Sequence, residues 1–156
     1  MLGMTYMKTK TAFAGFLTLV LTALLTTLSA AATGDAPKMP RVLANARFVY
    51  VTSYDGGQFN PEILPEDRAA IDRVQTAIQK WGKLTLVYRP QEADVILAVQ
   101  SRSSEDVLAV YQAHGGDEQS GPSQTFLWRV MGRGGLQKGE MPFFSQFETA
   151  WDKIAN

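Results

Sequence analysis

The chain has one histidine, His114, in the polar segment AHGGDE together with Asp117 and Glu118. Imidazole nitrogens and carboxylate oxygens bind zinc, and imidazole is also the usual general base that activates a serine. A structural zinc site normally needs four ligands held by the fold, whereas these three lie in a glycine-rich stretch of a cysteine-free chain. No serine lies in a Gly-x-Ser-x-Gly elbow. The pattern favours a solvated loop with no metal and no cofactor; a hydrolase or metal-binding enzyme using His114 with Asp117 and Glu118 is the alternative.

A second polar segment, DGGQ at 55–58, directly follows a predicted strand at 47–54. Open α/β sheets tend to bind ligands beyond the carboxyl ends of their strands. Asp55 and Gln58 offer polar groups there, and Tyr54 adds an aromatic ring. A tight turn that uses the backbone freedom of its two glycines would explain the same letters. With both interpretations open, Tyr54, Asp55 and Gln58 are the candidate partner-binding residues.

Two further patterns carry weaker signals. GRGG at 132–135 lacks the Lys-Ser or Lys-Thr that ends a phosphate-binding loop, so a flexible turn is the better interpretation. Trp128 and Arg129 are residue types enriched in interface hot spots, and they lie in a late strand that would suit a sheet edge. Alternation instead predicts Trp128 in the core on the same face as Phe126 and Val130, with Leu127 and Arg129 on the other face.

An amphipathic helix at 65–81 organises the domain. Its apolar stripe consists of Ile71, Val74, Ile78 and Trp81, with Pro65 at the first helical position and Gly82 at the stop. A last helix opens at Pro142 and carries a strongly aromatic stripe, so it must pack against the sheet. Trp81, Val74, Ile96 and Trp151 are predicted to be buried.

Strands are predicted at 47–54, 84–88, 95–99, 107–111 and 125–131, with a long loop at 113–124. The order β-α-β-β-β-β-α predicts an α/β (α+β) domain with a mixed five-stranded sheet and two packed helices. The first strand, helix and second strand should form a parallel crossover, and the short connection at 89–93 predicts an antiparallel hairpin of the second and third strands. The helices could share one face of the sheet; the continuous apolar run 95–99 instead favours opposite faces.

The amino terminus has the pattern of a secretory signal peptide. Lys8 and Lys10 precede an apolar run at 11–25, and small residues follow at 29–32. We therefore expect a signal peptide at 1–32, a flexible leader at 33–42 and a single domain at 43–156, in a protein that is periplasmic or secreted. An uncleaved membrane anchor is the alternative, because 11–32 approaches the length of a bilayer span.

Charge argues against some partners. The chain has 15 basic and 15 acidic residues, and only Lys8 and Lys10 precede residue 33, which leaves a net charge near −2 after cleavage. Such a balance gives no electrostatic footprint for nucleic acid, and we expect membrane contact only through the segment that is cleaved.

Four segments carry a resemblance: PEDRAAIDRVQTAIQKWGKLTLVYRPQEADVILAVQ, DVLAVYQA, LWRVMGRGGL and PFFSQFETAWDKI. They resemble a group of uncharacterised exported bacterial proteins, over roughly residues 43–154. The order of elements is also similar to small periplasmic α/β modules such as the N-terminal domain of the Tol-Pal translocation protein. The resemblance implies export and a shared fold, and it implies no activity and no functional residue. We therefore expect a non-enzymatic interaction or structural module of the bacterial envelope, whose partner is an envelope protein or a small ligand.

Overall fold

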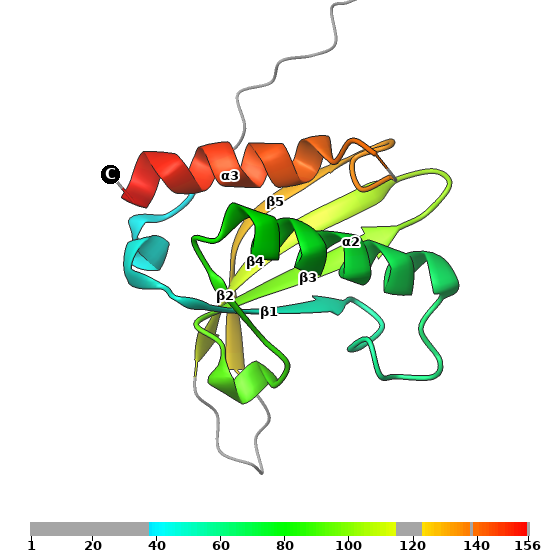
Figure 1. The fold of residues 1–156 in the computed structure, drawn as a ribbon, viewed down its shortest axis with the longest axis horizontal. Helices are drawn as coiled ribbons and strands as arrows, with labels where there is room; N and C mark the ends of the chain where they lie inside the picture. Colours follow the sequence, from blue (N-terminus) through cyan, green and yellow to red (C-terminus); the bar gives the residue numbers. More distant parts are fainter. Residues whose placement is uncertain (1–37, 115–122, 138, 156) are drawn as a thin grey trace, which may run out of the picture. The chain divides into compact units, whose positions relative to one another are not determined.

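The computed structural model describes residues 38–114, 123–137 and 139–155, and these belong to one compact unit. The predicted signal peptide lies outside the described residues. Along the chain the elements are η1 (Arg41–Asn45), β1 (Phe48–Ser53), α2 (Pro65–Trp81), β2 (Thr85–Val87), η2 (Pro90–Glu92), β3 (Val95–Ser101), β4 (Asp106–His114), β5 (Ser123–Gly132) and α3 (Pro142–Ala155). Apart from two short 3-10 helices, this confirms the predicted order (Figure 1). Within the described ranges, no helix is long and apolar enough to span a bilayer.

The five strands form one mixed sheet in the order β2-β1-β3-β4-β5. β1 pairs in parallel with β2, which confirms the predicted crossover through α2, and β3, β4 and β5 pair in antiparallel fashion. The predicted hairpin between the second and third strands is wrong, because β2 and β3 lie on opposite sides of β1 and run parallel to it. The connection 88–94 passes the start of β1, where the Asp94 carboxylate accepts hydrogen bonds from the backbone N–H groups of Arg47 (2.8 Å) and Phe48 (3.0 Å).

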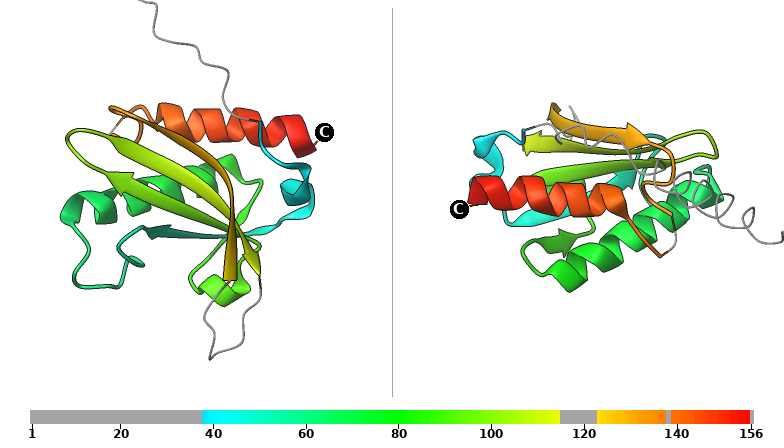
Figure 2. Two further views of the ribbon diagram at one scale, coloured as in Figure 1. Left: turned by 180° about the vertical axis from the view of Figure 1, so that it is seen from behind. Right: turned by 90° about the horizontal axis from the view of Figure 1, so that it is seen from above.

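Both helices pack on the same face of the sheet, which corrects the expectation of opposite faces (Figure 2). One core cluster joins them to inward-facing strand residues, namely Val49, Val51, Val95, Leu97, Val99, Leu108, Val110 and Trp128. On the other side of the strands Ile96, Ala98, Val107 and Ala109 are also buried. A central strand is therefore apolar and buried on both sides although only one face carries helices.

Helix α2 is bounded as its sequence predicts. Pro65 opens it, and Gly82 ends it with a left-handed φ of 71° and a hydrogen bond from its N–H to the carbonyl of Ile78 (2.9 Å). Its buried stripe packs on β1 and β3. Of the four residues predicted to be buried, Val74, Ile96 and Trp151 are, while Trp81 is only half-buried. Trp81 instead borders an aromatic cluster at α3, with ring centroids 5.7 Å from Phe147 and 6.0 Å from Trp151.

A β-bulge interrupts the pairing of β4 with β5. Val110 pairs with Trp128, and the next residue, Tyr111, pairs with Phe126, so Leu127 is the additional residue. Trp128 is buried in the core, as predicted. The shift turns Phe126 away from Trp128 and lets Leu127 pack against the core, so the predicted faces of both residues are wrong.

Asp106 joins three parts of the chain at the β3–β4 hairpin. Its carboxylate is fully buried and accepts hydrogen bonds from the Ser101 hydroxyl (2.9 Å) and from the backbone N–H of Leu136 (3.0 Å). Beside it, Gly135 lies so close to Phe143 that an added Cβ would be 2.2 Å from the ring. GRGG therefore serves a tight turn that brings the chain back to α3.

Candidate functional site

The loop after β1 is fixed by its own polar groups. The Ser53 hydroxyl donates to the carbonyl of Gly56 (2.9 Å) and accepts from the N–H of Asp55 (3.1 Å), and the Asn60 amide donates to the carbonyl of Asp55 (2.9 Å). Tyr50 packs beneath the loop, because a Cβ added to Gly57 would be 2.4 Å from its hydroxyl. Residues 55–60 thus form an ordered loop against the sheet.

Helix α2 holds the same loop from the side. Arg68 donates to the carbonyls of Gln58 (2.5 Å) and Asn60 (3.0 Å), and the Gln75 amide donates to the side-chain oxygen of Gln58 (2.8 Å). The carboxamide oxygen of Gln58 is therefore engaged within the fold. Phe59, at 79% exposure, is the most exposed large apolar side chain of this loop.

Asp55 belongs to an ion-pair chain at the carboxyl ends of β1 and β3. The Arg102 guanidinium pairs with Asp55 (2.9 Å) and with the fully buried Asp67 in the first turn of α2 (2.5 Å). Asp67 also accepts a hydrogen bond from the backbone N–H of Ser101 (2.7 Å). The hydrogen bond to Asp67, reinforced by the charges of both carboxylates, raises the pKa of Arg102. Through these two ion pairs, Arg102 connects the ends of β1 and β3 to the first turn of α2. The ion pairs therefore have a structural explanation, which is to hold these three elements together.

Tyr54 points away from these contacts, onto the sheet face opposite the helices. Its side chain is 45% exposed, and partial burial together with a hydrogen bond to Tyr111 raises the pKa of its hydroxyl to about 12, against the opposing charge of Arg129. Of the three predicted site residues, the structure therefore places Asp55 and Gln58 in internal contacts and Tyr54 elsewhere, among residues of β4 and β5.

Those residues form what we call the aromatic patch, namely Tyr54, Tyr111, Phe126, Arg129 and Met131. The rings of Tyr111 and Phe126 meet edge to face with centroids 5.6 Å apart, and the guanidinium carbon of Arg129 lies 6.0 Å from the Phe126 ring centroid. Phe126 is 52% exposed and Met131 47%. Of the patch, Tyr54 and Arg129 were named from the sequence as candidate contact residues, whereas Tyr111, Phe126 and Met131 were not; the bulge at Leu127 brings Phe126 onto the face of Arg129.

His114 is the last residue of β4 rather than part of a loop, since β4 continues to it and β5 begins at Ser123. Its Nε2 lies 2.9 Å from the hydroxyl of Thr125. The other two proposed ligands, Asp117 and Glu118, lie outside the described residues. Within the ranges that the structure describes, no three His, Cys, Asp or Glu side chains come close enough to hold a metal.

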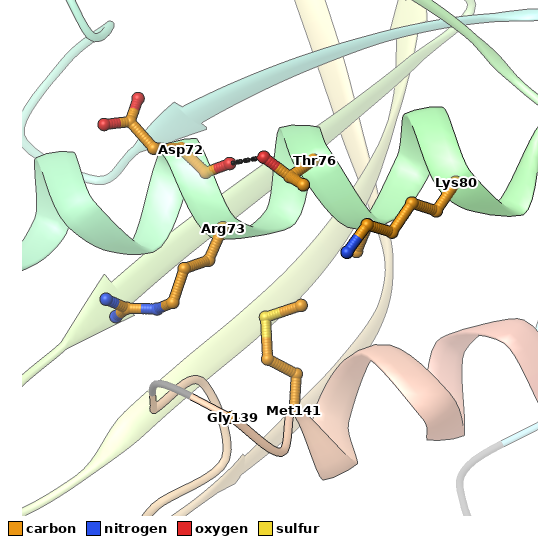
Figure 3. A pocket seen from close by; sticks show the side chains of 7 residues that line it. Asp72, Arg73, Thr76, Lys80, Gly139 and Met141 are labelled. Atoms are coloured by element: carbon orange, nitrogen blue, oxygen red, sulfur yellow. Dashed lines mark hydrogen bonds between the residues drawn. The ribbon is translucent and has the colours of Figure 1, made fainter.

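A groove of about 350 Å³ lies between α2 and the chain before α3 (Figure 3). Met141 extends toward α2 between Arg73 and Lys80. The Arg73 side chain donates to the carbonyl of Leu136 (2.8 Å), so it fastens the turn before α3 onto the helix. Beside the apolar side chain of Met141, the groove is lined by a positively charged residue, Lys80, and a negatively charged one, Asp72.

Comparisons of the chain with protein-family models, with curated proteins and with solved structures gave no match.

Proposed function

We propose that this chain is a non-enzymatic binding module that is exported to the bacterial envelope and contacts a partner protein through the aromatic patch. The observation that carries this proposal is the placement of both helices on one face, which leaves exposed aromatic and sulfur-containing side chains on the other. Soluble sheets that are open on one side normally alternate apolar and polar residues. An uncovered face with such side chains is typical of an interaction surface.

The composition of the patch suits protein recognition. Tyrosine and arginine are enriched in interface hot spots, and phenylalanine and methionine in interface cores. Here the rings brace one another through the edge contact of Tyr111 and Phe126, so the patch loses little side-chain freedom when a partner binds. Two buried residues border the patch on the same face, Ile96 paired with Tyr111 and Ala109 paired with Arg129.

The export part of the proposal rests on the pattern at residues 1–32. Intact-mass measurement of the protein isolated from the envelope fraction tests it. A chain that starts near Ala32 or Thr33 supports cleavage, whereas a full-length mass in the membrane pellet would establish an anchor.

Binding is tested with tagged protein recovered from its native envelope, followed by affinity measurement with the purified partner. Phe126→Ser should weaken the affinity by about tenfold or more, as for loss of an interface hot spot. Phe59→Ser is the control, since it removes from the loop a ring that is even more exposed (79% against 52%). If Phe59→Ser abolishes binding and Phe126→Ser leaves it intact, the loop at 55–60 is the contact surface and the patch is not. Equal melting temperatures of both variants and wild type exclude a folding defect.

A further inference from the structure

Resting on the proposed function, we infer that the partner segment presents a carboxylate flanked by apolar side chains, and that Arg129 binds this carboxylate. The aromatic patch would then bind a protein segment that has an acidic residue beside apolar ones. The inference names the chemistry of the partner and the residue that selects it.

The inference follows from the distribution of charge over the face of the sheet opposite the two helices, which we call the open face. Strand register assigns to that face Phe48, Tyr50 and Thr52 of β1, Ile96, Ala98 and Gln100 of β3, Val107, Ala109, Tyr111 and Ala113 of β4, and Gln124, Phe126, Arg129 and Met131 of β5. Among these described positions Arg129 is the only charged residue. The acids that form ion pairs in the described part of the domain, Asp55, Asp67, Glu92 and Asp152, pair with other cations. Within the described ranges, no carboxylate forms an ion pair with Arg129.

The surroundings of Arg129 prepare it to bind a carboxylate. Its guanidinium carbon lies 6.0 Å from the Phe126 ring centroid, and Phe126 is in turn braced by Tyr111. A guanidinium near a ring keeps N–H groups free for a bidentate pair with a carboxylate. Apolar groups around such a pair exclude water and lower the local dielectric, which strengthens the interaction.

The charge of the open face also disfavours two other occupants, a second copy of the chain and an anionic membrane. A second copy of the chain that docked through this face would bring Arg129 toward its counterpart, with no acid at the strand positions that the structure assigns to this face, and such like-charge contacts oppose association. An anionic membrane is normally bound by clusters of four to eight basic residues, whereas this face has one. A single carboxylate on a largely apolar protein segment matches what the face offers.

Selection of a displayed library of short random peptides on the immobilised full chain tests the inference. Wild type is compared with Arg129→Gln and with Lys153→Gln, a control that removes one positive charge from the exposed surface of α3. Peptides selected by wild type and by Lys153→Gln should be enriched in Asp or Glu beside apolar residues, and Arg129→Gln should lose that enrichment. A selected peptide should bind Arg129→Gln about tenfold more weakly, and its Asp→Asn or Glu→Gln form should show no further loss on Arg129→Gln.

The outcomes separate this inference from the proposed function. Peptides that lack acidic enrichment but depend on Phe126 would overturn the role of Arg129 and leave the proposed function standing. If the same peptides are selected by wild type, Phe126→Ser and Arg129→Gln, or if no peptides are selected at all, both the inference and the proposed function are overturned. Co-sedimentation with phosphatidylserine vesicles, or a concentration-dependent dimer, that is lost in Phe126→Ser would also overturn the inference, because a membrane or a second copy would then be the occupant.

Discussion

Replacing Asp106 by alanine should destabilise the fold through the two groups that lose their acceptor. The buried N–H of Leu136 would be left unpaired, which costs about 1–3 kcal/mol, and the Ser101 hydroxyl would lose a bond that contributes about 0.5–1.5 kcal/mol. Removing a buried carboxylate offsets part of this loss. We expect a net loss of about 2–4 kcal/mol in the free energy of unfolding.

Asparagine at the same position should cost much less. Its carbonyl oxygen can still accept from the N–H of Leu136, and its amide can donate to the Ser101 hydroxyl, which is able to accept. We expect a loss of about 1 kcal/mol. Glu105→Ala is the control, since it removes an exposed carboxylate from the adjacent position and should change stability by less than about 0.5 kcal/mol.

Urea unfolding followed by tryptophan fluorescence measures these differences. Trp81, Trp128 and Trp151 all contact Phe147, so the signal reports loss of the common core. A loss of 2–4 kcal/mol should lower the midpoint by about 1–2 M at an unchanged slope. The reasoning is refuted if Asp106→Ala unfolds at the wild-type midpoint, or if Asp106→Asn is as unstable as Asp106→Ala.

Three further predictions concern the sheet and its turns. Ile96→Ala should cost about 2–5 kcal/mol by urea unfolding, since the side chain is buried on the open face; wild-type stability would contradict its placement there. Because the folded-state pKa of Tyr54 is about 12 against 10.0 for the free side chain, its contribution to stability should be fully present below pH 10 and be lost as the pH rises to 12. Spectrophotometric titration should show this late ionisation, and Tyr111→Phe should lower the pKa; an unchanged titration would argue against their hydrogen bond. Gly135→Ala should lower the melting temperature more than Gly82→Ala, because only at Gly135 would the added methyl overlap a packed ring.

Local patterns were sufficient to predict most elements of this fold. The stripe of α2 and its Pro65 and Gly82 boundaries follow from helix periodicity and from backbone preferences of single residues, and the structure confirms them. The parallel pairing of β1 with β2 follows from the crossover through the helix. Each of these features depends on residues that are close in sequence.

The errors concern relations between distant segments. A short connection between β2 and β3 suggests a hairpin, but the hydrogen bonds of Asp94 to Arg47 and Phe48 fix that connection across the start of β1 instead. Apolar residues on both sides of β3 suggest two helical layers, although Ile96 and Ala98 are buried on the face that carries no helix. Neither outcome leaves a signature in the local sequence.

The candidate site shows the same limit. Tyr54, Asp55 and Gln58 are adjacent in sequence, yet the structure separates them, because Asp55 pairs with Arg102 and Gln58 bonds to Gln75. A bulge cannot be recognised from alternation alone, so the faces of Phe126 and Leu127 were predicted incorrectly. The composition TFLWRVM carries the only available signal, an unusual density of large side chains in one strand.

The position of β1 between β2 and β3 makes completion of the sheet a late event in synthesis. Both edges of β1 are satisfied by strands that come after α2, and the second of these, β3, begins only at Val95. Until β2 and β3 have been made, β1 lacks the strands that pair with it, and each pairing must also overcome the entropy of closing the intervening chain. When the first half of the chain has been made, β1 therefore has both of its edges still unpaired, and the sheet can close only after the second half follows.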